Sequence, residues 1–386
     1  MRILYVVSRP LEINTSASIR NKATIGGLLE LGHNIDLITT EYDKNHSNFD
    51  GSLSNDRLNV TYLKLSGIQG IVKISRKFKV LKPLKNIAYK IMSNFEIYDN
   101  LKGMSSYAMK VGISDIDYDV IISSSDPKSS HLFVSELFEK NILKNTPWIQ
   151  IWGDPFLSDI TRKNKLMKLK INKEEDRLLK YAKKAIYVSS LTLKLQKEIY
   201  PHYAKKMYCE PIPYVKKEIY PIKNIKEETL TFLYCGDYSS RIRDIKPFYE
   251  AIKNTKHKLI ICGGSDIKLE CTDRIKIYPR VSFEKTKELE RECDVLVHLS
   301  NLKGTQIPGK IYQYSGTNKL ILFLLDGDSE LLKETFMKYK RYIFAQNNIE
   351  VLEKSIEQIN KNKYNNYRFV VEEFSPKTIA DRIIKI

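Results

Sequence analysis

Apolar residues gather along the chain in short continuous runs, and amphipathic stretches of helical periodicity separate these runs. Continuous apolar runs of this length are typical of strands buried on both faces of a parallel sheet. In the first half of the chain the pattern predicts a helix over 18–31 and strands at 3–7, 35–39, 60–65, 120–123, 148–152 and 185–188. In the second half it predicts helices from about 245, 283 and 308 and strands at 231–235, 258–262, 274–278, 294–299 and 320–325.

A segment without any period separates these two halves. Residues 206–228 contain three prolines and no sustained apolar repeat, which is typical of a linker. A chain of 386 residues is also too long for one ordinary core and suits two domains. We therefore predict an α/β protein with two doubly wound, Rossmann-like domains that face a central cleft. The expected divisions are an N-terminal domain over 1–205, a linker over 206–228, a C-terminal domain over 229–370 and a closing helix over 371–386.

Composition narrows the choice of partners only a little. Hydrophobic residues make up 42% of the chain and charged residues 28%, which is a globular balance. The formal net charge of +18 favours an anionic partner such as a phosphate group, a membrane surface or nucleic acid. Nucleic-acid binding rests on this charge alone, because the sequence contains no recognisable nucleic-acid-binding module, and we do not expect it.

Cysteine usage and hydropathy favour a cytoplasmic protein. The five cysteines form no CxxC pair, so we expect neither a zinc site nor a disulfide framework. The apolar start of the chain is interrupted by Ser8 and Arg9, which is too early for a signal peptide. The apolar run 320–325 is far shorter than the ~20 residues that span a bilayer.

The segment 301–315, NLKGTQIPGKIYQYS, places candidate chemistry directly after a predicted strand. Pro308 and Gly309 stand where the next helix is predicted to begin, and the unpaired amides of a helix N-terminus suit a diphosphate. Lys310 adds a cation in the first turn, where the helix dipole disfavours one, and this favours a bound anion nearby. An ordinary helix that starts at a proline and carries a surface lysine is the alternative.

The same segment carries a family resemblance. "TQIPGKIYQYSGTNKLILF" resembles the PSKxxEYxxxxKP segment of family-4 retaining glycosyltransferases that build bacterial polysaccharides. Other parts of that family are similar, in the same order, to "LLELGHNIDLITT", "DVIISSSDPKSSHLFVSELFEKNILKNTPWIQIWGDPF", "FLYCGDYSSRIRDIKPFYEAI" and "VVEEFSPKTIADRI". The resemblance covers nearly the whole chain. It implies the GT-B fold and a donor site that includes Thr305, Gln306, Ile307, Pro308 and Gly309.

The sequence departs from this family at three places, one of which is the glycine pair often found after the first strand, replaced here by Asn14-Thr15-Ser16. The family usually has a Glu, seven residues and a second Glu in the donor domain, and the matching positions here are Thr305 and Gln313. Gln313 can still hydrogen-bond a ribose hydroxyl, but as a neutral partner. Many members carry a sugar-contacting histidine after the fourth strand, and here that place has the sequence Ser124-Ser125-Asp126-Pro127.

The loop after the first strand of the C-terminal domain offers further diphosphate ligands. The resemblance implies basic residues there, and Arg241 is the better match with Arg243 second, although a solvated basic loop is the alternative. A guanidinium binds phosphate oxygens through two parallel hydrogen bonds. Gly236 and Gly263 follow neighbouring strands, where they either let the backbone approach a ligand or turn the chain. The resemblance implies that Val281, with Arg280 and Ser282, lies in the loop that contacts the nucleotide base in relatives, and a plain loop is the alternative.

Acidic residues suggest one site in the N-terminal domain and argue against another. Asp154 follows the strand 148–152, and relatives carry an Asp there, so it is a candidate for binding sugar hydroxyls; a helix N-cap before Pro155 is the alternative. Residues 115–119, DIDYD, contain a DxD pattern, which binds metal in a different glycosyltransferase fold. They precede a strand, and so lie at the edge of the sheet away from ligands. We expect no metal cofactor.

Two basic stretches are candidates for membrane contact. Residues 71–92 contain seven Lys or Arg and no acid, interleaved with apolar side chains, and residues 162–173 contain six and no acid. Such segments suit an anionic membrane surface, where each charge contributes about 1 kcal/mol. A solvated helix face is the alternative.

Residues and resemblance together predict an enzyme of the hexosyltransferase class. The sequence predicts transfer of a sugar from a nucleotide-diphosphate sugar, expected to be UDP-linked, to a surface-polysaccharide or lipid-linked glycan acceptor, with retention of configuration and without metal. Arg241, Lys310 and Asp154 are the predicted catalytic residues, and the two cations would stabilise the charge that develops on the leaving diphosphate. A nucleotide-sugar epimerase and a non-catalytic nucleotide-sugar-binding subunit are the alternatives. The epimerase is disfavoured, because no cluster of acidic and histidine residues is evident and His131 is predicted to lie on a helix.

Overall fold

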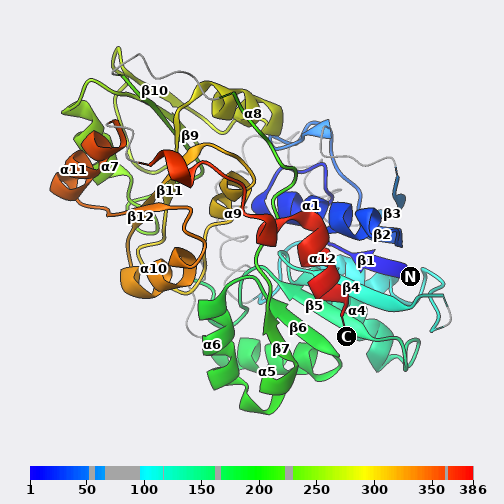
Figure 1. Ribbon diagram of the computed structural model, residues 1–386. Helices are drawn as coiled ribbons and strands as arrows, with labels where there is room; N and C mark the ends of the chain where they lie inside the picture. The colour runs from blue at the N-terminus through cyan, green and yellow to red at the C-terminus, as the bar shows by residue number, and fades with distance from the viewer. Residues whose placement is uncertain are drawn as a thin grey trace, which may run out of the picture. The chain divides into compact units, whose positions relative to one another are not determined.

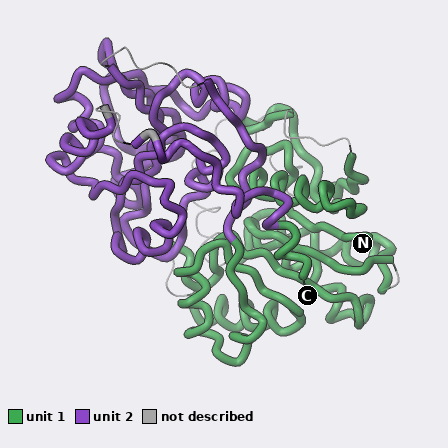
Figure 2. The backbone as a smooth tube through the Cα atoms, viewed as in Figure 1, with its two compact units in different colours: residues 1–210, 380–386 green, residues 211–379 purple. Residues whose placement is uncertain are grey.

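The computed structural model describes residues 1–51, 57–65, 96–115, 117–160, 167–221, 229–360 and 364–385. The chain forms two compact units (Figure 2), with residues 1–210 and 380–386 in unit 1 and residues 211–379 in unit 2. Each unit contains a parallel sheet with helices packed against it (Figure 1).

Within the described part of unit 1, seven strands form one parallel sheet in the order β3-β2-β1-β4-β5-β6-β7. The strands are β1 (Arg2–Val6), β2 (Asn34–Thr40), β3 (Asn59–Leu63), β4 (Val120–Ser124), β5 (Trp148–Trp152), β6 (Lys184–Tyr187) and β7 (Met207–Cys209). The helices are α1 (Ser16–Glu30), η3 (Lys102–Tyr107), α4 (Ser129–Glu139), α5 (Lys168–Lys180), α6 (Ser190–Ile199) and η5 (Pro201–Lys206). Every residue of β4 and β5 is buried, as expected for central strands covered on both faces.

Local capping sets the ends of α1. The hydroxyl of Thr15 accepts a hydrogen bond from the backbone N–H of Ser18 at 3.2 Å, so the helix begins two residues before the predicted position. Gly32 ends it with φ of +81°, a conformation that glycine adopts without strain.

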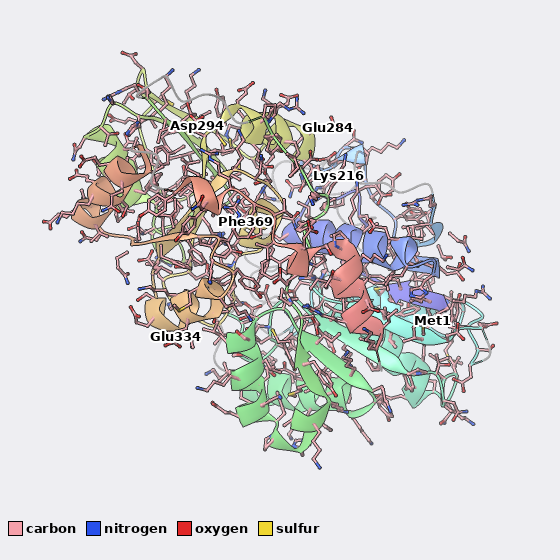
Figure 3. All side chains as sticks on the ribbon, in the orientation of Figure 1. Met1, Lys216, Glu284, Asp294, Glu334 and Phe369 are labelled. Atoms are coloured by element: carbon pink, nitrogen blue, oxygen red, sulfur yellow. The ribbon has the colours of Figure 1, made fainter. Side chains whose placement is uncertain are left out.

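In unit 2, the described residues include six strands in one parallel sheet, in the order β10-β9-β8-β11-β12-β13. The strands are β8 (Thr231–Cys235), β9 (Lys258–Cys262), β10 (Ile275–Tyr278), β11 (Val295–Leu299), β12 (Leu320–Leu325) and β13 (Ile343–Gln346). The helices are α7 (Lys246–Lys253), α8 (Phe283–Glu292), α9 (Lys310–Ser315), α10 (Ser329–Met337), α11 (Ile349–Asn360), η6 (Asn365–Tyr367), η7 (Glu372–Phe374) and α12 (Pro376–Ile384). At the amino ends of the strands, the carboxylate of Asp294 (labelled in Figure 3) accepts a hydrogen bond from the backbone N–H of Thr231 at 2.8 Å.

The end of α12 belongs to unit 1 and is held there by a buried lysine. The ammonium group of Lys184 donates to the carbonyl oxygens of Arg382 at 2.8 Å, Lys385 at 3.1 Å and Ile383 at 3.3 Å. A cation satisfies the unpaired carbonyl groups at a helix C-terminus, so one side chain on β6 fastens the last turn of the chain.

The structure confirms the predicted strands to within two residues at each end and adds two that were not predicted. The short strand β7 lies inside the predicted linker 206–228, and β13 has only a brief apolar run at the edge of its sheet. The helix predicted from about 308 begins at Lys310 and has only six residues. No helix in the described part of the chain has the length and apolar character needed to cross a bilayer.

Candidate functional site

The strand order places a ligand-binding edge in each unit. Both sheets are doubly wound, and the strand order reverses between β1 and β4 in unit 1 and between β8 and β11 in unit 2. Ligands of open parallel sheets bind beyond the carboxyl ends of the strands at such a reversal. The loops that follow β1, β4, β8 and β11 are therefore the first places to look for functional side chains.

In unit 2, two of the predicted glycines bring neighbouring loops together. The N–H of Gly236 donates to the carbonyl of Cys262 at 2.8 Å, and a Cβ on Gly263 would lie 2.6 Å from the carbonyl carbon of Gly236. Only a glycine fits this close approach of two backbones. The carboxylate of Asp237 accepts a hydrogen bond from the N–H of Gly264 at 2.9 Å and pairs with Arg280, next to the half-buried Val281.

The predicted arginines follow β8 in a turn closed by backbone hydrogen bonds between Ser239 and Arg243. The side chain of Arg241 is exposed, whereas Arg243 is half-buried and its Nε atom has no hydrogen-bond partner among the described residues. The N–H of Leu302 donates to the carbonyl of Ile242 at 2.7 Å. This bond joins the turn to the loop after β11, so the arginines lie at the strand reversal of unit 2.

His298 on β11 is a neighbour of Arg243 that the sequence analysis missed. Its side chain is 2% exposed, and burial, with the charge of Arg243 second, lowers its pKa to about 3. The imidazole is therefore neutral at physiological pH, and its Nε2 atom has no partner within the described part of the chain. The sequence feature that could have identified His298 is that it is a single polar residue within the apolar sequence VLVHL.

Lys310 also lies near the carboxyl ends of unit 2 strands. Its ammonium group is 5.8 Å from the ring centre of Tyr314 and interacts electrostatically with the thiols of Cys235 and Cys262, the last residues of β8 and β9. The loop before it is closed by a 2.8 Å hydrogen bond from the side-chain amide of Asn301 to the carbonyl of Gln306. In this loop Ile307 is buried, while half-buried positions are occupied by Thr305, Gln306, Pro308 and Gly309.

Gln313 is held by backbone groups. Its side-chain oxygen accepts from the N–H of Val215 at 3.0 Å, and its side-chain NH₂ group donates to the carbonyl of Pro213 at 2.9 Å. The side chain is 8% exposed. Both polar atoms therefore fasten the segment that enters unit 2, and a ribose contact would have to use the second lone pair or the second N–H.

In unit 1 the structure groups Asp154 with four charged side chains, here called the charge cluster: Arg20, Asp126, Lys128, Asp154 and Asp159. The backbone N–H of Asp154 donates to the carboxylate of Asp126 at 3.1 Å, and Lys128 pairs with Asp126. The ammonium of Lys128 lies 3.9 Å from the carboxylate of Asp159. Arg20, from α1, donates to the hydroxyl of Ser124 at 3.4 Å and interacts with the charges of Asp126 and Asp154. The cluster therefore gathers at the carboxyl ends of β4 and β5.

Burial and charge set the protonation states in the cluster. Burial acts to raise the pKa of Asp126, but Lys128 and then Arg20 outweigh it, so that this pKa lies below its usual value of 3.8. Burial, followed by the negative charge of Asp126, raises the pKa of Asp154 to about 7. Two neighbouring carboxyl groups thus differ in their readiness to hold a proton, which is typical of acid–base sites.

The structure corrects two expectations about unit 1. The alternative role of Asp154 as a helix N-cap is wrong, because residues 153–160 form bends and turns. The sequence also showed no cluster of acidic groups, whereas the structure contains one. Its members come from segments far apart in the chain, and the available signal was the polar sequence DPK directly after a buried strand. His131 lies on α4 as predicted, and its Nδ1 atom shares a 2.7 Å hydrogen bond with Ser123.

The acids at 115–119 have structural partners at the opposite edge of the sheet. The carboxylate of Asp115 accepts hydrogen bonds from the backbone N–H groups of Lys144 and Thr146, and that of Asp119 accepts one from Arg2. Of the described residues, no three or more His, Cys, Asp or Glu side chains are grouped so as to hold a metal ion.

Comparison with known proteins identifies the fold. The sequence matches no protein-family model and no curated protein. The catalytic domain of starch synthase IV from Arabidopsis thaliana, bound to ADP and acarbose, is similar in structure with a TM-score of 0.62 and 9% identity, over 100% of this chain and 95% of that chain. For α,α-trehalose 6-phosphate synthase from Burkholderia multivorans the TM-score is 0.58 and the identity 11%, over 100% of this chain and 97% of that chain. For UDP-N-acetylglucosamine 2-epimerase from Rickettsia bellii the TM-score is 0.52 and the identity 12%, over 100% of this chain and 95% of that chain. The chain has the GT-B fold, with two Rossmann-like α/β domains.

Proposed function

We propose that the protein is a glycosyltransferase that moves a sugar from a nucleotide-diphosphate sugar, UDP-linked in the simplest case, to a surface-polysaccharide or lipid-linked glycan acceptor. The observation that carries this proposal is the set of cations at the ligand edge of unit 2. Arg243 and Lys310 stand in or beside the loops that follow β8 and β11, and Arg241 is exposed in the same turn. The GT-B fold, shared with two synthases that handle sugars, supports the same conclusion.

The chemistry of sugar transfer suits these side chains. When the bond between the anomeric carbon and the diphosphate breaks, negative charge grows on the diphosphate oxygens. Fixed cations beside those oxygens stabilise the transition state more than the ground state, and removal of one such donor commonly costs about 10²–10³ in rate. The proposal includes retention of configuration and no metal, both of which rest on the family resemblance.

The test is incubation of the protein with a panel of labelled UDP-, ADP- and GDP-sugars, with glycan and lipid-linked acceptors, in the presence and absence of EDTA. The proposal expects release of the nucleoside diphosphate together with labelled product in both conditions. If the donor binds but is returned unchanged from every combination, the protein is a non-catalytic binding subunit and the proposal is wrong.

A nucleotide-sugar epimerase is the second candidate, and the charge cluster favours it. Epimerisation needs acid and base groups beside the sugar ring, and Asp126 and Asp154 are adjacent carboxyl groups with different protonation states. The epimerase from Rickettsia bellii shares the fold. The same incubation separates the candidates, because an epimerase returns a donor of altered configuration without any acceptor.

We also propose peripheral contact with the inner face of an anionic membrane. The basic stretch 71–92 lies outside the described residues, and 162–173 is described from residue 167 onward. At the start of α5, Leu169 is 78% exposed beside the exposed Lys168, Lys170 and Lys173, which supports the proposal.

Sedimentation with vesicles tests this contact. The protein should bind vesicles that contain anionic lipid, and binding should weaken at high salt because the surface field decays over about 8 Å at physiological ionic strength. Substitution of the three α5 lysines by Glu should weaken binding more than the matched change at Lys253, Lys256 and Lys258. Equal sedimentation with neutral and anionic vesicles would discard the proposal.

A further inference from the structure

Asp126 and Asp154 form a carboxyl pair at the strand reversal of unit 1. They follow the adjacent strands β4 and β5, and their side chains are within hydrogen-bonding reach of one another. Two ionised carboxylates at such a distance repel, and a pair of this kind therefore binds one proton more tightly than either group alone.

The cations of the cluster are buried, whereas the carboxyl groups of Asp126 and Asp154 are partly exposed. Arg20 and Lys128 are each 5% exposed, whereas the side chain of Asp126 is 30% exposed and Asp154 is half-buried. The Nε atom of Arg20 has no partner among the described residues. The carboxyl pair is therefore partly accessible to a ligand, while the buried cations act on it electrostatically.

We infer that Asp154 accepts the proton of the reacting sugar hydroxyl and that Asp126, Lys128 and Arg20 position and tune it for this task. This inference rests on the proposed glycosyl transfer. The O–H bond of the acceptor breaks and its proton passes to the carboxylate of Asp154. The acceptor oxygen bonds to the anomeric carbon of the donor, whose bond to the diphosphate oxygen breaks, and the nucleoside diphosphate leaves with that electron pair. Proton transfer to Asp154 is compatible with attack on either face of the sugar.

A general base works best when its pKa lies near the working pH, and Asp154 meets this condition. Two other groups that face the cluster, Tyr5 and His131, do not titrate near neutrality. Burial raises the pKa of Tyr5 on β1 to about 12 and lowers that of His131 on α4 to about 3. Glu175 on α5, whose charge acts on Lys128, accepts backbone hydrogen bonds from Phe156 and Leu157. The electrostatic effect of Asp159 adds to the rise in the pKa of Asp154.

The pH profile of turnover tests the inference. In the wild-type protein, a plot of kcat/KM against pH should show a rising limb centred at about pH 7, where Asp154 ionises. Asp126→Asn removes a negative neighbour and should move this limb to lower pH, whereas Lys128→Met removes a positive neighbour and should move it to higher pH, each by about one unit. A merely structural role predicts no such opposite shifts. Asp154→Asn should lower kcat by about 10²–10⁴-fold and abolish the limb.

Matched variants and a second measurement keep the result interpretable. Asp159→Asn should shift the limb down by less than Asp126→Asn, and Asp117→Asn at the opposite edge should leave it in place. The carboxyl ¹³C resonance of Asp154 should titrate near pH 7, and its midpoint should shift in each variant together with the pH limb of turnover. This measurement requires neither enzymatic activity nor the Lys128 variant. The inference is overturned if the carboxyl group of Asp154 titrates near pH 4. It is also overturned if neither Asp126→Asn nor Lys128→Met shifts the pH limb of transfer. Absence of any transfer by a protein whose Asp154 titrates near 7 would instead count against the proposed function.

Discussion

Gly153 lies between Asp154 and β5, and its substitution by alanine tests how tightly the charge cluster is packed. A Cβ on Gly153 would lie 3.0 Å from both Cζ and Nη2 of Arg20, and closer still to Nη1. Carbon atoms in ordinary contact are about 3.5–4.0 Å apart. Because Nη1 is the nearest atom, the guanidinium would have to move by roughly 1 Å or more to restore ordinary contact, although its side chain is only 5% exposed.

The cost of Gly153→Ala follows from this overlap. Overpacking a filled interior costs about 1–3 kcal/mol, and each kcal/mol lowers the Tm of a unit of about 200 residues by about 2–4 °C. A displacement of about 1 Å among groups that position a substrate can reduce turnover about 10²-fold. We expect a modest loss of stability and a large loss of turnover, because Arg20 is the end of a side chain and can yield while the backbone stays in place.

Differential scanning calorimetry and turnover with the accepted donor measure these two effects. Gly26→Ala is the matched control, since Gly26 lies inside α1 with nothing within 4 Å of its added Cβ, and it should raise stability by about 0.5–1 kcal/mol. If the effect acts through Arg20, then Arg20→Gln with Gly153→Ala should lose no more turnover than Arg20→Gln alone. Wild-type melting and turnover in Gly153→Ala would refute the reasoning.

Three further predictions concern single side chains. Lys310→Ala and Arg241→Ala should each reduce turnover at least about tenfold with an unchanged melting transition, and near-normal rates in both would remove them from the donor site. The pKa of Asp154 is about 7 in the folded protein and about 3.9 when unfolded. Between these pH values Asp154 holds a proton in the folded state but not in the unfolded state, so the folded protein loses stability as pH rises across that window. Asp154→Asn escapes this loss, so its gain in Tm over the wild type should be larger at pH 8 than at pH 4. Gln313→Ala should cost about 1–3 kcal/mol, measured by urea unfolding, because it leaves buried backbone groups without partners, whereas Gln346→Ala at an exposed strand end should be nearly neutral.

The fold class, and the loops at the carboxyl ends of the unit 2 strands, could be predicted from the sequence. Strands such as Trp148–Trp152 and Leu320–Leu325 are predictable, because continuous burial requires an apolar residue at every position. Arg243 could be selected because it stands in the loop after β8, and Lys310 because it begins the helix that follows the loop after β11. These are local properties, and a short window of residues contains all the information they need.

The composition of the charge cluster and the hydrogen bonds of Gln313 depend on tertiary contacts. Arg20, Asp126 and Asp154 lie on three segments whose approach depends on the pairing of β1 with β4 and of β4 with β5. In sequence, Asp126 is one polar residue among many. Its neighbours in space determine whether a carboxyl group stays ionised or holds a proton, because burial and the charge of adjacent groups set its pKa. Likewise, Gln313 matched a ligand position in the sequence, but the backbone of Pro213 and Val215 occupies its amide in the folded protein.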